Sequence, residues 1–442
     1  MQPAKIIHTP RRYVVEEWGG TETVVMHLAR QQKAGGLQPL IFTSLALSVT
    51  KSEVVEGTPV RRFSYRYPFF GLSPEQVHAL DKKGGNMVSL SLFAALLREP
   101  GVRLFHAHAI NRLGGMVRTA ARLRKLPYVV SLHGGYFDVP AEEAADLQKP
   151  VAGHFEWGKP FGALFGSRKV LSDADYVICV GRSEAEKAAQ ALRHHRVAYL
   201  PNGVDTGRFA AGDGASFRHA HQIPQDAFLV LNLSRLDGQK NQLLLLEAFS
   251  LFKKSSPTAV LALMGPETHA SYAAKLRHFI QQHGLQNSVR LIPGLPPGSP
   301  EVVNAYHACD VFVLPSIHEP FGIVVLEAWS SGKPVVASCV GGLKHLIEPG
   351  KTGLFIDPGD QAAPLVLSEQ LRLLERMPSL RRQLGTAGQE MARERYSWER
   401  IWGDLEDIYG KAEVHAASRY RAKKSQMEPW GNQAEPCSKA SV

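Results

Sequence analysis

The chain contains 442 residues, of which 44% are hydrophobic and 21% are charged, and it carries a net charge of +10. These proportions are typical of a globular protein and exclude collagen-like and intrinsically disordered chains. The length exceeds that of one ordinary domain, so we expect two domains of roughly 200 residues each. No run of ~18 apolar residues occurs, so no membrane-spanning helix is expected, and the apolar start of the chain is interpreted as a strand instead of a signal peptide.

Short β-rich runs alternate with longer helical stretches, and this theme occurs twice. In the first half, strands are expected at 5–9, 39–43, 60–65, 103–108, 128–133, 176–180 and 198–201, with helices at 21–33, 112–124 and 183–194. In the second half, strands are expected at 228–234, 259–264, 289–293, 311–315, 334–338 and 353–356, with helices at 241–253, 270–282, 300–307, 323–331 and 361–376. The alternation predicts an α/β protein with two doubly wound parallel sheets and a ligand cleft beyond the carboxyl ends of the strands.

The composition along the chain predicts the domain boundaries. We expect a first domain at residues 1–205, a Gly/Asp/Ala-rich linker at 206–216 and a second domain at 217–395. From residue 413 the chain becomes basic and polar with few apolar anchors, which predicts a disordered tail over 413–442.

The positive charge lies in the first half. Residues 1–200 carry 26 basic and 17 acidic side chains, whereas residues 201–442 carry 25 and 24. Such a field attracts a phospholipid surface, a lipid-phosphate acceptor or a nucleic acid, although a solvated basic face without a partner explains it equally well. Because no zinc-finger, recognition-helix or aromatic RNA-binding pattern occurs, no nucleic-acid partner is expected.

The four cysteines are Cys179, Cys309, Cys339 and Cys437, and none forms a Cys-x-x-Cys pair. We interpret them as small hydrophobic residues of a reducing compartment, without disulfide or zinc chemistry. The expected location is therefore the cytoplasm.

The clearest candidate site follows a buried strand, where a Pro-Phe-Gly turn separates Glu319 from Glu327. A helix that starts near Gly322 would present the free N–H groups of Phe321, Gly322 and Ile323, which suit anions and sugar hydroxyls. The two carboxylates suit paired hydroxyls, because each can accept two hydrogen bonds. The alternative is an ordinary surface helix with one capping glutamate.

Two further loops contain candidates for binding phosphates. Arg235 and Lys240 follow the first strand of the second domain. The planar guanidinium of Arg235 and the compact ammonium of Lys240 could converge there on a diphosphate. Gly19 and Gly20 follow the first strand of the chain and allow backbone N–H groups to approach a phosphate, but they match neither the dinucleotide-binding glycine pattern nor the P-loop. The alternative for the loop of Arg235 and Lys240 is an exposed basic loop without a ligand. The alternative for Gly19 and Gly20 is an ordinary turn at the start of a helix.

Histidines end two strands of the first domain. His133 is expected to face the cleft, where it could hydrogen-bond a transferred sugar, although histidine is also common at strand ends for structural reasons. His106 is expected to pack or hydrogen-bond inside the domain. His106 and His108 could suggest a metal pair, but no third ligand has a recognisable spacing, so no metal site is expected.

Taken in order, these segments resemble glycosyltransferase family 4, a group of retaining nucleotide-sugar transferases with the GT-B fold. The resemblance rests on Gly19-Gly20-Thr-Glu, His106-Ala-His108, Leu132-His133-Gly134, Pro201-Asn-Gly-Val-Asp205, Ser234-Arg235-Leu…Lys240, Gly265-Pro266, Glu319-Pro-Phe-Gly…Glu327 and Gly341-Gly342. The match extends over residues 5–410. The ordered set is specific, although most of its pieces are not.

The resemblance implies two Rossmann-like domains that face each other across a cleft, with a helix at 396–412 that crosses back onto the first domain. It implies that Arg235 and Lys240 hold the diphosphate, that Glu327 binds the ribose and that Glu319 binds the transferred sugar. The implied catalytic residues are His133, Glu319, Arg235 and Lys240. The implied donor-binding residues are Gly19, Gly20, Arg235, Lys240, Gly265, Glu319, Phe321, Gly322, Ile323 and Glu327.

The implied activity is retaining transfer of a hexosyl unit from a UDP- or GDP-sugar to a glycan or lipid-linked glycan, in the synthesis of cell-surface polysaccharide or glycolipid. Catalysis would be positioning and charge neutralisation, without a metal or other cofactor. The expected partners are the nucleotide sugar, the glycan acceptor and, at the inner face of the membrane, anionic lipid. After Gly341-Gly342 the family carries Pro-Glu where this chain has Lys344 and His345, so recognition of the base or ribose is expected to differ.

Two other functions remain open on the same fold. A sugar-nucleotide epimerase would need no acceptor, so product analysis separates it from a transferase. A non-catalytic nucleotide-sugar binding protein would bind the donor without turnover. The complete set of Arg235, Lys240, Glu319 and Glu327 argues against this last alternative.

Overall fold

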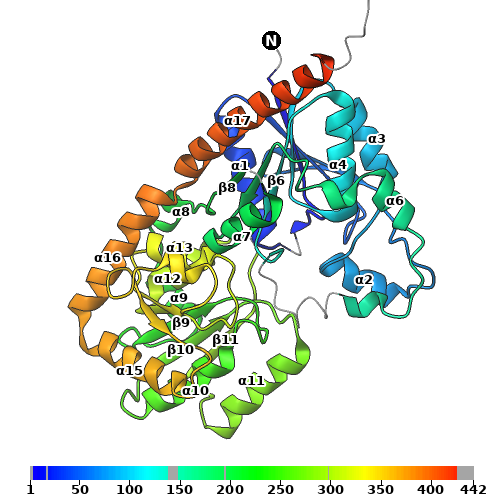
Figure 1. The fold of residues 1–442 in the computed structure, drawn as a ribbon. Helices are drawn as coiled ribbons and strands as arrows, with labels where there is room; N and C mark the ends of the chain where they lie inside the picture. Colours follow the sequence, from blue (N-terminus) through cyan, green and yellow to red (C-terminus); the bar gives the residue numbers. More distant parts are fainter. Residues whose placement is uncertain (1–2, 16–17, 138–147, 194–195, 297, 426–442) are drawn as a thin grey trace, which may run out of the picture.

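The structure is a computed structural model that describes residues 3–15, 18–137, 148–193, 196–296 and 298–425. Figure 1 shows two α/β halves, along one side of which helices α16 (Pro378–Arg395) and α17 (Trp398–Ser425) run from the second half to the first. Two largely parallel sheets, each with its own helices, confirm the fold class that strand–helix alternation predicted.

The first sheet has eight strands in the order β3-β4-β2-β1-β5-β6-β7-β8, and β3–β4 is its one antiparallel pair. The strands are β1 (Lys5–Thr9), β2 (Gln38–Ser44), β3 (Ser52–Val55), β4 (Thr58–Phe63), β5 (Val102–Ala107), β6 (Tyr128–Leu132), β7 (Tyr176–Cys179) and β8 (Val197–Tyr199). The helical segments are α1 (Gly20–Ala34), α2 (Pro74–Lys82), α3 (Leu90–Arg98), α4 (Asn111–Arg124), η2 (Lys149–Val151), α6 (Lys159–Leu164), η3 (Ser167–Lys169) and α7 (Arg182–Leu192). Strands β1, β5 and β6 are buried along almost their whole length, as expected for a parallel sheet covered on both faces.

The second sheet has six parallel strands in the order β11-β10-β9-β12-β13-β14. The strands are β9 (Leu229–Leu233), β10 (Val260–Met264), β11 (Val289–Ile292), β12 (Val311–Leu314), β13 (Val335–Ser338) and β14 (Leu354–Ile356). The remaining helices are α10 (Gln242–Lys253), α11 (Ala270–Gln282), α12 (Pro300–Ala308), α13 (Ile323–Ser330), α14 (Leu343–Leu346) and α15 (Ala363–Arg376). Because β9 and β12 are parallel neighbours, the loops that follow them lie at the same edge of the sheet.

The segment predicted as a linker, 206–216, contains regular structure. Helix α8 (Thr206–Phe209) lies within it and α9 (Gly214–Ala220) begins in it. Phe209 and Phe217 are 2% and 1% exposed and belong to the apolar core of the second half. The segment is therefore anchored to the second half by its aromatic side chains.

The predicted tail is wrong for residues 413–425, because α17 continues without a break to Ser425. Its first turns pack Trp398, Leu405 and Tyr409 against the first sheet. Farther along, the fully buried carboxylate of Asp175 accepts hydrogen bonds from His415 at 2.7 Å and lies 3.1 Å from Arg419. A buried charge partner therefore holds the basic end of the helix, which its polar composition alone did not reveal. Residues 426–442 lie outside the described part of the chain. Among the described helices, none has both the length and the apolar character needed to cross a bilayer.

Candidate active site

Lys240 and Glu319 meet at the edge of the second sheet. Lys240 lies in the loop after β9, and Glu319 lies in the loop after β12. The Lys240 Nζ atom is 2.6 Å from Glu319 Oε2, and the two side chains are only 14% and 10% exposed. The structure thus joins two predicted site residues in an ion pair that is largely removed from water.

Arg235 lies in the same loop as Lys240 but contacts different groups. Its guanidinium is 45% exposed, 3.2 Å from Asp237 Oδ2 and 3.4 Å from Gln239 Oε1. Asp237 also accepts the Lys240 backbone N–H at 3.1 Å, so this carboxylate organises the loop. The convergence of Arg235 and Lys240 on a diphosphate stays a prediction, because the two cations contact different carboxylates in this structure.

Glu327 lies on α13, where it is bonded to a residue that the sequence did not single out. The Tyr306 hydroxyl of α12 donates to Glu327 Oε2 at 2.8 Å, which fixes the orientation of the carboxylate. Burial raises the pKa of Glu327 above its ordinary value and raises that of Tyr306 well above its own, so this phenol stays a donor at neutral pH. No sequence pattern distinguished Tyr306 from the other apolar-face residues of its helix.

The turn between Glu319 and α13 is enclosed by glycines. A Cβ at Gly341 would lie 2.2 Å from the Glu319 carbonyl oxygen, and a Cβ at Gly342 would lie 2.1 Å from that of Pro320. The Gly342 N–H donates to the Glu319 carbonyl at 2.9 Å. Gly322, which precedes α13, has a φ of +96°, in the left-handed region that favours glycine. These contacts hold the turn and the start of α13 in place.

The first half meets this turn through its own glycine loops. A Cβ at Gly134 would lie 2.2 Å from the Pro320 Cβ, and a Cβ at Gly20 would lie 4.0 Å from the Ile323 Cδ1. The loop of His133 therefore packs against the Glu319 turn, and the predicted glycine loop lies beside the start of α13. On the other side, Gly265 packs on the Ser234 carbonyl, so it supports the Arg235 loop directly.

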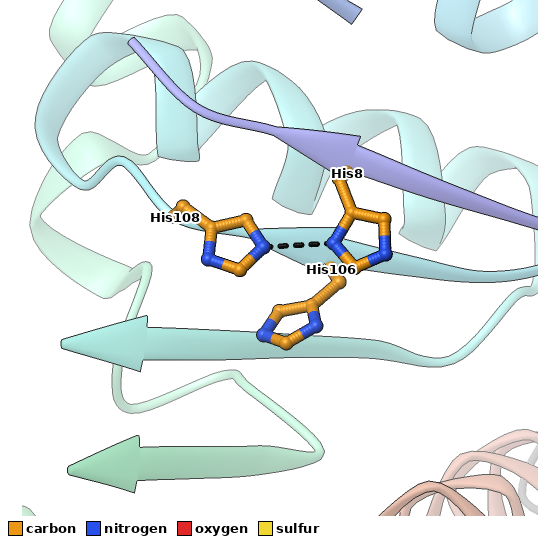
Figure 2. A group of neighbouring side chains, drawn as sticks. All are labelled: His8, His106 and His108. Atoms are coloured by element: carbon orange, nitrogen blue, oxygen red, sulfur yellow. Dashed lines mark hydrogen bonds between the residues drawn. The ribbon is translucent and has the colours of Figure 1, made fainter. Parts of the chain in front are cut away.

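His133 ends a chain of hydrogen-bonded histidines in the first sheet. Its Nε2 lies 2.8 Å from His108 Nδ1, and His108 Nε2 lies 2.9 Å from His8 Nδ1. His106 has hydrogen bonds to Tyr409 and Ser131, both at 2.7 Å, which confirms its expected internal role. Figure 2 shows His8 on β1 and His106 on the neighbouring strand β5, with His108 just beyond the end of β5 and the His8–His108 hydrogen bond drawn.

These three histidines also bring one ring nitrogen each within 4.8 Å of one another, close enough to hold a metal ion. The third member, His8, could not be found by spacing, because it joins His106 through the parallel β1–β5 register. However, the nitrogens of His8 and His108 bond to each other, and both nitrogens of His106 bond to hydroxyl groups. The geometry is therefore that of a hydrogen-bonded network.

A pocket of about 360 Å³ opens beside His133. Among the described residues that line it, Glu22 is the one acidic residue and four are cationic, namely Arg11, Arg12, Lys82 and Lys83. Arg11 donates to the carbonyl oxygens of Leu80 and Asp81, at 3.0 and 2.8 Å, and thereby holds the end of α2 at the pocket. The sequence did not reveal this cluster, because its members come from two segments about seventy residues apart.

Two family models cover most of the chain. Residues 19–203 match the glycosyl transferase 4-like domain, and residues 214–391 match glycosyl transferases group 1. Similar curated proteins include the D-inositol 3-phosphate glycosyltransferases of Geodermatophilus obscurus and Kribbella flavida, both 30% identical. The first match covers 91% of this chain and 87% of the relative, and the second covers 86% and 88%.

Similar solved structures include Alr3699/HepE of Anabaena in complex with UDP and glucose, with a TM-score of 0.69 at 21% identity over 92% of this chain and 99% of that one. Sucrose-phosphate synthase of Thermosynechococcus elongatus has a TM-score of 0.68 at 21% identity, over 94% and 100% of the two chains. Two facing α/β halves of this kind define the GT-B class of glycosyltransferases. The chain belongs to the group 1 glycosyl transferase family with a 4-like N-terminal domain, and it is a glycosyltransferase.

Proposed function

We propose that the protein transfers a hexosyl unit, with retention of configuration, from a UDP-sugar to a hydroxyl of a small phosphorylated acceptor. The observation that carries this proposal is the pocket beside His133, whose described lining has four cationic side chains and one acidic residue. A cluster of cations in a concave site suits a phosphate group, because charge-assisted hydrogen bonds are the strongest that a protein can offer it. The curated relatives are named for D-inositol 3-phosphate, a phosphorylated polyol of this kind.

The donor would bind along the second sheet, in the manner predicted from the sequence. Lys240 and Arg235 neutralise the diphosphate, Glu319 accepts from the sugar hydroxyls and Glu327 accepts from the ribose. The N–H groups of Phe321, Gly322 and Ile323, at the start of α13, would bind the sugar, and Gly19, Gly20 and Gly265 would allow close backbone approach. A similar structure that holds UDP and glucose supports the choice of uridine.

The reaction would proceed on the face from which the diphosphate leaves. The bond from the sugar C1 to the diphosphate oxygen breaks, and the acceptor oxygen forms a bond to C1 on the same face. The acceptor proton passes to the departing phosphate oxygen. Catalysis then consists of positioning and of neutralising the charge that develops on the diphosphate, with no metal required by the scheme.

The decisive test is release of nucleoside diphosphate from a panel of UDP-, GDP- and ADP-sugars, in EDTA, with inositol phosphates and hexose phosphates as acceptors. UDP release that depends on a phosphorylated acceptor is expected. Conversion of the sugar nucleotide without an acceptor would identify an epimerase, and calorimetric binding without turnover on any acceptor would favour a binding protein. Release from a GDP- or ADP-sugar alone would refute the uridine assignment.

The pocket cations should govern the affinity for the acceptor. Lys82→Ala and Lys83→Ala are each expected to raise the acceptor KM about tenfold, because a hydrogen bond to a charged group is lost, while the donor KM stays unchanged. Lys254→Ala, which removes an exposed lysine of the second half, is the matched control. An unchanged acceptor KM in both pocket variants would place the acceptor elsewhere.

A lipid-linked glycan acceptor at an anionic membrane is the second candidate. Two exposed aromatic side chains of the first half favour it: Phe70 and Phe155 are 62% and 71% exposed, and their rings stack at 6.1 Å. Exposed rings on a basic half suit the interface of an anionic bilayer. Sedimentation with phosphatidylglycerol vesicles at low salt should then be weakened by Phe70→Ser with Phe155→Ser, and absence of wild-type binding would exclude this surface.

A further inference from the structure

We propose that Gln32 and Tyr409, through the histidine chain, hold His133 in the neutral Nε2–H tautomer, so that its buried, unpaired Nδ1 is a hydrogen-bond acceptor beside the pocket that His133 lines. Gln32 and Tyr409 are positioning residues in this scheme, since neither lies in the cleft. The assignment of the tautomer stands on the hydrogen-bond geometry of neutral rings. Only its consequence for the sugar, a hydroxyl that donates to His133, rests on the proposed function.

The direction of the hydrogen bonds along the histidine chain is set first at the Gln32 side chain on α1. Its amide oxygen lies 2.8 Å from His8 Nε2, and its amide nitrogen donates to the Tyr409 hydroxyl at 3.2 Å. An amide oxygen only accepts, so His8 must carry its proton on Nε2. The His8 Nδ1 atom of the neutral ring is then an acceptor.

The same direction of hydrogen bonding, in which Nε2 donates and Nδ1 accepts, follows for each next ring. His108 Nε2 lies 2.9 Å from the accepting His8 Nδ1 and must donate, which leaves His108 Nδ1 as an acceptor. His133 Nε2 lies 2.8 Å from that atom and must donate in turn. This polarity holds for neutral rings, and burial lowers the pKa of His8 and of His133 to about 4 and that of His108 well below its ordinary value.

Tyr409 closes the network from the crossover helix. Its hydroxyl accepts from Gln32 and can therefore donate to His106 Nδ1 at 2.7 Å. His106 then donates from Nε2 to Ser131 Oγ, also at 2.7 Å. Through these hydrogen bonds α17 joins the network that sets the tautomer of His133, which lines the pocket.

The free end of the chain is the His133 Nδ1 atom. This atom is buried and has no hydrogen-bond partner among the described residues, and its neighbour Gly134 packs against Pro320 of the Glu319 turn. The opposite polarity would need a rotated Gln32 amide and would leave an N–H of His133 unpaired in the same place. A buried unpaired N–H is rarer in proteins than an under-used acceptor, which favours the polarity described.

The test is the tautomer of His133 in protein labelled with ¹⁵N-histidine, read from two-bond ¹⁵N–¹H correlations and assigned by comparison with His133→Gln. The wild-type ring is expected to be protonated on Nε2 alone. Gln32→Leu should give a mixture of tautomers, whereas Gln32→Glu keeps an accepting oxygen for His8 and should restore the single form. Gln31→Leu, on the preceding residue of α1, whose side-chain amide donates to Glu399 at 3.4 Å outside this network, is the matched control.

Kinetics supply the second readout. Gln32→Leu is expected to raise the KM for the nucleotide sugar about tenfold, the cost of one weakened hydrogen bond, with little change in the acceptor KM. A wild-type His133 protonated on Nδ1, or a single Nε2–H form that survives Gln32→Leu and Tyr409→Phe alike, would overturn the proposal. Since the tautomer is measured without turnover, an inactive but correctly protonated protein would refute the proposed function and leave this inference standing.

Discussion

Replacement of Glu319 or of Lys240 by alanine is expected to lower turnover of the nucleotide sugar about 10²–10³-fold, the usual effect of removing one group that stabilises developing charge. The two side chains form a close, poorly solvated ion pair at the edge of the second sheet. In such surroundings a charge acts strongly on its neighbours. Loss of Lys240 removes a cation that would meet the leaving diphosphate, and loss of Glu319 leaves that cation without the carboxylate that orients it.

The measurement is single-turnover release of UDP, together with the denaturation midpoint of each variant. Lys351→Ala and Glu348→Ala are matched controls, because these residues form an exposed ion pair at 2.7 Å in the same half of the protein. Exposed pairs of this kind contribute little to stability, so the controls should retain full activity. Wild-type turnover in either Glu319→Ala or Lys240→Ala would remove that residue from the site.

Two conservative variants, Lys240→Arg and Glu319→Gln, separate the effect of charge from that of shape. Lys240→Arg keeps the positive charge but changes the shape of the cationic side chain. Glu319→Gln keeps the shape of the side chain but removes its negative charge. If Lys240 acts mainly by neutralising the diphosphate, Lys240→Arg should retain more activity than Lys240→Ala. If Glu319 acts mainly by orienting Lys240, Glu319→Gln should lose nearly as much as Glu319→Ala.

Most of the fold was predictable, because strand and helix patterns are local properties of the chain. Thus β12 and α13 lie within two residues of where their apolar runs predicted them. The elements that were missed depend on distant partners. The sequence at the end of α17 resembles a polar tail, because the residue that holds it, the buried Asp175, lies 240 residues away from His415. Likewise β3 is a four-residue edge strand whose pattern is too short to recognise.

The site residues were predictable only where a single segment of the sequence contains a recognisable pattern. Glu319 and Glu327 were found together because a turn and a helix start lie between them, but the bond from Lys240 to Glu319 spans 79 residues and depends on the pairing of β9 with β12. His8 has no neighbour in sequence that suggests a network. Its position opposite His106 follows from the parallel register of β1 and β5, which no single segment encodes.

The buried histidines predict a marked loss of stability in mild acid. His8 is fully buried and His27 is 7% exposed, and burial lowers the pKa of each from its ordinary value of 6.5 to about 4. His27 lies near Arg30 and Arg208, which add to this lowering, while Asp205 and Glu56 oppose it. Burial also lowers the pKa values of His106 and His108, which face His8, well below the ordinary value, so His8 has no charged partner among them at neutral pH.

The sign follows from where each state takes up its proton. As the pH falls through 6.5 the unfolded chain protonates these rings, whereas the folded protein does so only near pH 4. Stability is therefore full above pH 6.5, is lost progressively between 6.5 and 4, and does not fall further on this account below 4. Each such histidine is expected to cost about 2 kcal/mol between pH 7 and pH 5. Burial raises the pKa of Glu22 and Glu327, which acts in the opposite sense as the carboxylates begin to protonate.

Urea denaturation at pH 7.5, 6.5 and 5.5 measures this slope, and His27→Gln isolates one contribution to it. His27 stacks on Trp398 at 4.8 Å, so the variant loses some stability at every pH, but its stability should depend less steeply on pH than that of the wild type. His283→Gln, at an exposed position on the second half, is the matched control for the loss of a histidine. Equal slopes for the wild type and His27→Gln would mean that His27 accepts its proton in the folded state. The ring would then be reached by water at the contact between α1 and α17, and the same access would weaken the case for a neutral histidine chain beneath the cleft.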